Sequence, residues 1–159
     1  MPNFIIKDVK KQTPIQNLDE QINEMTVVRR EDLQAAHWEL YMHGASGVII
    51  KVDLMKDGYR VLYDAAVMVG NAGTSERLTF KKPRTLGKII RVVKEIGLDK
   101  GDWTGTDDYN CQDFVIAFMR GIKMDDSQIF KYELRRVATK HYPPSITEGM
   151  RGQIPTTNF

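Results

Sequence analysis

Cysteine is almost absent from this chain, since Cys111 is the only one among 159 residues. A single thiol excludes an intramolecular disulfide and any metal site built from several cysteines, and it suits a reducing compartment. Long hydrophobic runs are also missing. No stretch approaches the roughly 18 apolar residues of a membrane helix, and residues 4–6 form too short a run for the apolar region of a signal peptide. We therefore expect a cytoplasmic protein with no integral membrane segment.

A large excess of one charge is missing as well, because 23 Lys and Arg residues stand against 21 Asp and Glu residues, for a net charge of +2. This balance lacks the strong positive charge of nucleic-acid-binding domains, so we expect no nucleic-acid partner. The 12 glycines and 6 prolines are too few for a collagen-like or low-complexity chain, and 42% of the residues are hydrophobic. Length and composition predict a single globular domain.

The apolar pattern predicts strands first and helices afterwards. Alternating and β-branched residues favour three antiparallel strands, at about 37–42, 47–55 and 59–68. Asp57-Gly58 is a hairpin signal between the last two of them. A further strand is expected within 76–84. Three helices are expected, from Thr85 to a stop at Gly97, from Cys111 to Gly121, and over 126–140.

The chain is expected to divide into three parts, an N-terminal arm, a central domain and a C-terminal tail, at residues 1–34, 35–141 and 142–159. Leu18, Ile22 and Met25 follow helical spacing, which favours a short helix in the arm. We expect an α+β fold for the central domain, with an antiparallel sheet of four or five strands packed against the helix that carries the cysteine at its N-terminus.

Two residues of this domain bear chemistry, His37 at the start of a strand and Cys111 at the start of a helix. A helix N-terminus favours the thiolate form of a cysteine, and a nearby imidazole takes its proton as a base. Catalytic Cys and His residues are neighbours in space rather than in sequence, so the long separation between the two is no obstacle. The alternative is that Cys111 is a small buried hydrophobe on the apolar face of its helix.

The segments HWELY around His37 and NCQDFV around Cys111 resemble motifs of the circularly permuted papain-like group. That group includes relatives of lecithin-retinol acyltransferase, NlpC/P60 hydrolases and PPPDE deubiquitinase-like proteins. The histidine strand precedes the cysteine helix, as in the permuted members, and the resemblance covers roughly residues 35–122. It implies a permuted papain-like domain and thiol chemistry on an amide, ester or thioester carbonyl, with Cys111 as nucleophile and His37 as base.

The third polar residue departs from the family pattern. Many relatives carry a second histidine on the next strand, whereas this chain has Lys51 near that place, and an ammonium cannot accept the imidazole N–H. Asp53 lies two residues further on and so on the same face, which makes it the predicted orienting residue, with Asp64 second. Tyr41 and Gln112 are candidates for binding substrate or the oxyanion.

The sequence therefore predicts a cysteine-dependent hydrolase or acyltransferase that needs no cofactor and acts on a peptide, protein or acyl-lipid substrate. Two alternatives stay open: a catalytically silent papain-like domain that binds a protein or peptide, motivated by Lys51, and a lipid acyltransferase at a membrane surface. A metal site built from Cys111 and the histidines at 37, 43 and 141 is disfavoured. A basic cluster at 77–94 is expected to be a solvated face or to meet an anionic partner.

Overall fold

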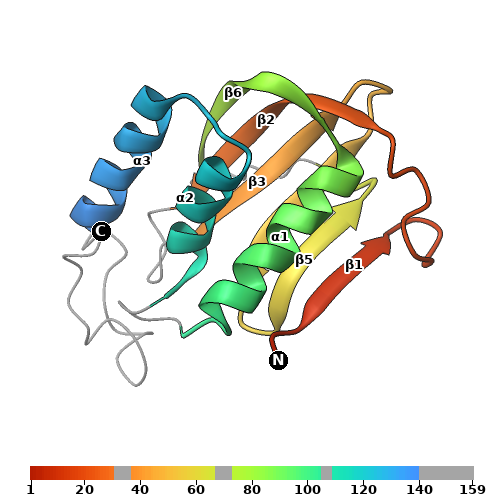
Figure 1. The fold of residues 1–159 in the computed structure, drawn as a ribbon, viewed down its shortest axis with the longest axis horizontal. Coiled ribbons are helices and arrows are strands. Elements are labelled where there is room, and N and C mark those ends of the chain that lie inside the picture. The colour runs from red at the N-terminus through yellow and green to blue at the C-terminus, as the bar shows by residue number, and fades with distance from the viewer. Residues whose placement is uncertain (31–36, 67–72, 105–108, 140–159) are drawn as a thin grey trace.

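The computed structural model describes residues 1–30, 37–66, 73–104 and 109–139. They form two layers, a six-stranded sheet and three helices that cover one of its faces (Figure 1). The strands are β1 (Phe4–Asp8), β2 (Gln21–Arg30), β3 (His37–Gly44), β4 (Ile49–Met55), β5 (Gly58–Tyr63) and β6 (Thr74–Thr85). The helices are α1 (Leu86–Lys100), α2 (Cys111–Gly121) and α3 (Asp126–Thr139). The predicted α+β class, with Cys111 opening a helix, is confirmed.

The centre of the sheet is the predicted meander. Strands β3, β4 and β5 are consecutive, adjacent and antiparallel, in a sheet of order β1-β5-β4-β3-β2-β6. The tight turn before Gly58 pairs Met55 with Gly58 and so sets the register of the β4–β5 hairpin. The sheet has six strands rather than the expected four or five, because the N-terminal residues add two.

The helix predicted around Leu18–Met25 is wrong, because residues 21–30 form strand β2 in the interior of the sheet. Ile22 and Met25 both point into the core although they are three positions apart, an odd number that would put them on opposite faces of a regular strand. A β-bulge between Ile22 and Glu24 inserts one residue and reverses the alternation of faces there. The bulge thus produces a spacing that imitates a helix.

Residues 1–30, which were expected to form most of an N-terminal arm, contribute two strands to the sheet. Strand β1 pairs with β5 in parallel, and β2 pairs with both β3 and β6, so these residues belong to the same sheet as the rest. Buried apolar side chains on β2 explain why it does not stay separate from the core. Residues 31–34 and the tail at 142–159 lie outside the described residues.

The three helices begin where the sequence predicts. The Thr85 side chain caps α1 by accepting a hydrogen bond from the Lys88 backbone N–H. The predicted stop at Gly97 is wrong, because α1 continues to Lys100 and ends against Gly101, whose φ is 81°. Gly97 instead gives room to Phe4, whose ring atoms would lie 2.6 Å from an added Cβ. This glycine is therefore required for helix-to-strand packing.

The core lies between the helical layer and the sheet. It takes alternate side chains from the strands, including Trp38, Leu40 and Met42 of β3, together with the apolar faces of α1 and α2. Residues at the intervening positions of β3, from His37 to Tyr41, consequently point to the opposite face of the sheet. In the described part of the chain, no helix has the length and apolar character needed to span a bilayer.

Candidate active site

The site lies where the pairing of β3 with β4 ends. Paired residues run from His43 and Ile49 as far as Leu40 and Val52, although both strands continue beyond that point. The next residues in line, Glu39 and Asp53, face each other across the end of the ladder. The side-chain period of two puts them on one face. An unpaired end of this kind leaves space for polar side chains and for the start of a helix.

Helix α2 brings Cys111 to this end of β3. The Trp38 backbone N–H, which lies beyond the last β3–β4 pair, donates to the Cys111 sulfur at 3.5 Å. Asn110 caps the helix, accepting from the backbone N–H groups of Gln112 and Asp113, while the Asp113 carboxylate accepts from the Asn110 N–H in return. This capping box fixes the position of the first turn, and with it the thiol.

A long-range ion pair holds the same turn from the side of α3. The Arg136 guanidinium, which is buried, donates to both oxygens of Asp113 at 3.0 and 3.3 Å. Bidentate pairing of this kind fixes orientation as well as distance. Arg136 therefore acts on Cys111 through the capping residue and not by contact.

The His37 imidazole connects the thiol with two carboxylates. The Cys111 side chain is one of the hydrogen-bonding partners that raise the pKa of this imidazole. Its Nε2 lies 3.2 Å from a Glu39 oxygen and 3.5 Å from an Asp53 oxygen. Cys111 is 4% exposed, whereas the His37 side chain is 22% exposed. The three predicted residues Cys111, His37 and Asp53 are thus brought together, and solvent reaches the group at the imidazole.

The surroundings of His37 favour its charged form. Burial lowers the pKa of this imidazole, but hydrogen bonds to Asp53, Cys111 and Glu39 more than compensate and raise it to about 11. Burial also raises the pKa of Asp53, and hydrogen bonds from His37 and Arg60 bring it below its usual value. At neutral pH the site therefore contains an imidazolium beside ionised carboxylates.

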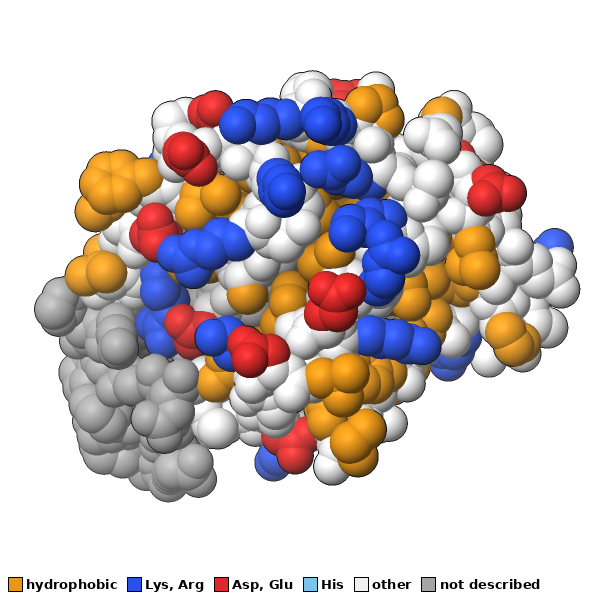
Figure 2. Space-filling model, viewed as in Figure 1, with side chains coloured by type: hydrophobic (Ala, Val, Ile, Leu, Met, Phe, Trp, Pro, Cys, Tyr) orange, Lys and Arg blue, Asp and Glu red, His pale blue; other side chains and the backbone are white. Residues whose placement is uncertain are grey.

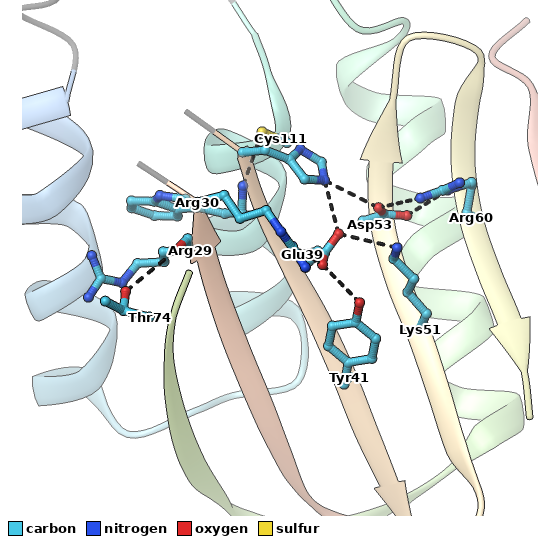
Figure 3. Close-up of polar contacts among 11 residues, drawn as sticks. Arg29, Arg30, Glu39, Tyr41, Lys51, Asp53, Arg60, Thr74 and Cys111 are labelled. Atoms are coloured by element: carbon cyan, nitrogen blue, oxygen red, sulfur yellow. Dashed lines mark hydrogen bonds and ion pairs between the residues drawn. The ribbon is translucent and has the colours of Figure 1, made fainter. Parts of the chain in front are cut away.

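Glu39 is the most heavily contacted carboxylate of the site (Figure 3). Tyr41 donates to it at 2.8 Å, Lys51 lies at 3.2 Å, and Arg30 forms an ion pair with it. Burial raises the pKa of Glu39, while hydrogen bonds from His37, Tyr41 and Arg30 and the Lys51 charge hold it well below its usual range. Glu39 is therefore anionic at neutral pH.

Asp53 is fully buried and is held by Arg60 in addition to His37. The Arg60 guanidinium on the neighbouring strand donates to its two oxygens at 2.8 and 2.7 Å, an arrangement visible in Figure 3. Together, Arg30, Lys51 and Arg60 form a partly exposed cationic rim around two buried carboxylates. These cations compensate the negative charge of Glu39 and Asp53, and both carboxylates still contact His37.

Four residues named from the sequence have other surroundings than expected. Tyr41 gives its hydroxyl proton to Glu39, so it positions that carboxylate rather than an oxyanion. Gln112 is 3% exposed, and its backbone N–H is used by the helix cap. The Lys51 ammonium contacts Glu39 and does not take the place of the residue that orients the His37 imidazole. Asp64 pairs with Lys10 at 3.3 Å, away from the site.

Sequence reasoning missed Glu39 and Arg60, although both leave a signal. Glu39 lies two residues after His37 on the same strand and therefore shares its face. The hairpin register that follows from the turn before Gly58 pairs Asp53 with Arg60, as opposite charges on adjacent strands. Arg30 leaves no such signal, because its place next to Glu39 depends on β2 being a strand.

One ring nitrogen of His37 and one carboxylate oxygen each of Glu39 and Asp53 lie within 4.8 Å of one another. This spacing would suit a metal ion. The charges of the donors do not fit one. Three cationic side chains already compensate the two carboxylates, and a divalent cation would add to the positive charge beside them. His43 contacts Thr26 instead, and His141 lies outside the described residues. The geometry favours an imidazolium.

Comparisons of the chain with protein-family models, with curated proteins and with solved structures find no match.

Proposed function

We propose that this protein is a cysteine-dependent hydrolase or acyltransferase of the circularly permuted papain-like type, acting on an amide, ester or thioester carbonyl. The observation that carries the proposal is the His37 imidazole, which contacts both the Cys111 thiol and two buried carboxylates. Such a chain of thiol, imidazole and carboxylate is the arrangement that activates a cysteine nucleophile. The order of the motifs supports the permuted type, since β3 precedes α2.

In this mechanism the resting site is a thiolate–imidazolium pair. The carboxylates of Glu39 and Asp53 stabilise the imidazolium, while the helix N-terminus and the Trp38 N–H stabilise the negative sulfur. Because His37 already carries its proton, it acts first as a general acid rather than as the base expected from the sequence. The ion pair therefore needs no cofactor to generate its nucleophile.

The reaction has two steps. The Cys111 thiolate attacks the carbonyl carbon and forms a thioester, while the bond to the leaving group breaks and that group takes the proton from His37. The neutral imidazole then removes a proton from water, or from the hydroxyl or amine of an acceptor, which attacks the thioester. The thiolate leaves and the imidazolium is restored. Hydrolysis and acyl transfer thus differ only in the second nucleophile.

Lys51 was the reason to consider a catalytically silent binding domain. Its ammonium lies against Glu39, and the two carboxylates remain within reach of His37. This arrangement supports the active alternative. A peptide, protein or acyl-lipid substrate and a cytoplasmic location stay predictions.

The proposal is tested with activated acyl substrates. Incubation with 4-nitrophenyl esters should release nitrophenol in a burst equal to the enzyme concentration, and intact mass should show one acyl group on Cys111. Cys111→Ala and His37→Ala should abolish both signals, while Arg91→Gln on the exposed face of α1 should leave them unchanged. Equal nitrophenol release from the Cys111→Ala variant would refute the proposal. Panels of peptide, ubiquitin-like and phospholipid substrates then distinguish the substrate classes.

A further inference from the structure

A second candidate site lies on the helical side of the molecule and shares no residue with the Cys111–His37 group. It is a pocket of about 350 Å³ between the end of β6, the first turn of α1 and the end of α2. Figure 2 shows Lys and Arg side chains gathered in a band across the upper part of this face. The pocket is lined by five cations and one glycine: Lys81, Lys82, Arg84, Lys88, Lys123 and Gly121.

The charge of this pocket is uncompensated. No acidic residue lines it, and within the described ranges none of its five cations forms an ion pair. Other cations near this face are paired, as Arg120 is with Glu133 and Lys131 with Glu76. Like charges held around one concavity repel each other and focus a positive potential into it. An anionic ligand would relieve that repulsion.

A neighbouring pocket provides a contrast within the same face. It shares Lys81 and Lys123 but is also lined by Asp126 and Glu133, so its charge is mixed. The positive potential is therefore concentrated in the acid-free pocket.

The backbone around the pocket is built to bring the cations together. Gly121 lets the end of α2 approach α1 so closely that an added Cβ would lie 2.6 Å from a Val92 methyl carbon. The Arg84 guanidinium is anchored by donating to the Ile122 carbonyl at 3.0 Å. Lys123 adopts a left-handed conformation with φ of 59°, which a lysine side chain disfavours. Close packing, an anchored guanidinium and local strain thus all lie at the edge of this pocket.

We propose that this pocket binds a small polyphosphorylated group, in a role separate from the proposed hydrolase site. Phosphate groups are dense, multiply charged and rich in acceptor oxygens, which suits four ammonium groups and one guanidinium around a small volume. The volume is at the lower end for ligand sites and fits a diphosphate-sized group better than an extended polymer. A soluble phosphate ester and a phosphoinositide headgroup offer the same chemistry.

The proposal is tested by titrating the full chain with inorganic pyrophosphate in a calorimeter. The pocket variant is Lys82→Gln with Lys88→Gln, and the matched control is Arg91→Gln with Lys94→Gln. The control pair lies exposed on α1 outside the pocket, and both variants lose the same charge. Equal melting temperatures establish that both fold. Cys111→Ser should bind like the natural chain, which separates this site from the proposed catalytic one.

We expect saturable binding of pyrophosphate at one site. Its affinity should decrease at least about tenfold in the pocket variant and less than about twofold in the control. Recruitment to phosphatidylcholine vesicles that carry a phosphoinositide bisphosphate, reversed by pyrophosphate, would support the site and identify a lipid headgroup as its source. Pyrophosphate binding without recruitment would support the site and identify a soluble source. Absence of saturable pyrophosphate binding, or equal loss of affinity in the two variants, would overturn the proposal.

Discussion

Replacing Asp53 by a neutral residue should lower the pKa of His37 but leave it above its ordinary value. At 3.5 Å the carboxylate and the imidazolium are close enough for an interaction of roughly 5 kcal/mol at an effective dielectric constant of about 20. Arg60 shares the same carboxylate through two hydrogen bonds, so only part of this energy acts on His37. We expect Asp53→Asn to lower the pKa of His37 by about two, at ~1.4 kcal/mol for each unit.

The second carboxylate sets the outcome at neutral pH. From a pKa of about 11, a decrease of about two leaves His37 protonated at pH 7, with Glu39 still 3.2 Å away. Glu39→Gln is therefore expected to resemble Asp53→Asn, with near-normal alkylation of Cys111 at pH 7. The double variant should lose the imidazolium and most of the alkylation rate, because no carboxylate remains to stabilise it.

NMR titration of the imidazole signals is the assay, with His37→Gln used to assign His37 among the three histidines. Thermal melts report folding, since removing a carboxylate from a buried pair is expected to cost about 2 kcal/mol here, where the cations are partly exposed. If Asp53→Asn alone returned His37 to its ordinary pKa near 6.5, the idea that two carboxylates share this role would be refuted. A double variant that still titrated near 11 would refute any role for them.

Three further outcomes follow from the packing and charges. Arg136→Gln should lower the free energy of unfolding by about 1–3 kcal/mol and slow Cys111 alkylation, because Asp113 loses its buried partner. The control Arg120→Gln removes an exposed ion pair and should change the free energy of unfolding by less than ~0.5 kcal/mol. Urea denaturation and alkylation rates check both variants. Gly97→Ala should destabilise by about 1–3 kcal/mol in urea denaturation, the reverse of the usual gain inside a helix, because the new methyl group meets the Phe4 ring; unchanged or greater stability would contradict this packing. Because the pKa values of Glu39 and Asp53 are depressed, these carboxylates stabilise the fold above about pH 4, and this stabilisation is lost as the pH falls. Because the pKa of His37 is raised, its imidazolium stabilises the fold below about pH 6.5, and this stabilisation is lost as the pH rises toward 11. Melting temperatures should therefore decrease toward both extremes, and a Glu39→Gln, Asp53→Asn double variant should show a flatter acid side.

Much of this fold follows from local pattern. The turn before Gly58 and the alternation around it predict the β3–β4–β5 meander, and the cap at Thr85 predicts where α1 begins. The element that pattern misassigns is β2, because its bulge gives Ile22 and Met25 the spacing of a helix. The error also concealed how residues 1–30 complete the sheet, since pairing partners far along the chain are not encoded in local periodicity.

The residues of the site can be predicted from the sequence where they depend on strand register. A shared face on β3 and β4 brings Asp53 to His37, and the same rule would have added Glu39. The contact between Cys111 and His37 follows from the resemblance and not from spacing, because α2 meets β3 only in the folded chain. The hold of Arg136 on the start of α2 depends on how α3 packs, which no local motif in the sequence describes.

The most direct test of the thiolate–imidazolium pair is the rate at which iodoacetamide alkylates Cys111 as a function of pH, measured by intact mass on the folded protein and on His37→Ala. We expect rapid alkylation at neutral pH and a marked loss of that rate in His37→Ala. This variant should also melt at a lower temperature, because two buried carboxylates lose their imidazolium, so its rate is measured well below its melting temperature. A Cys111 that resists alkylation until the protein unfolds, or that reacts equally in both proteins, would contradict the proposed pair.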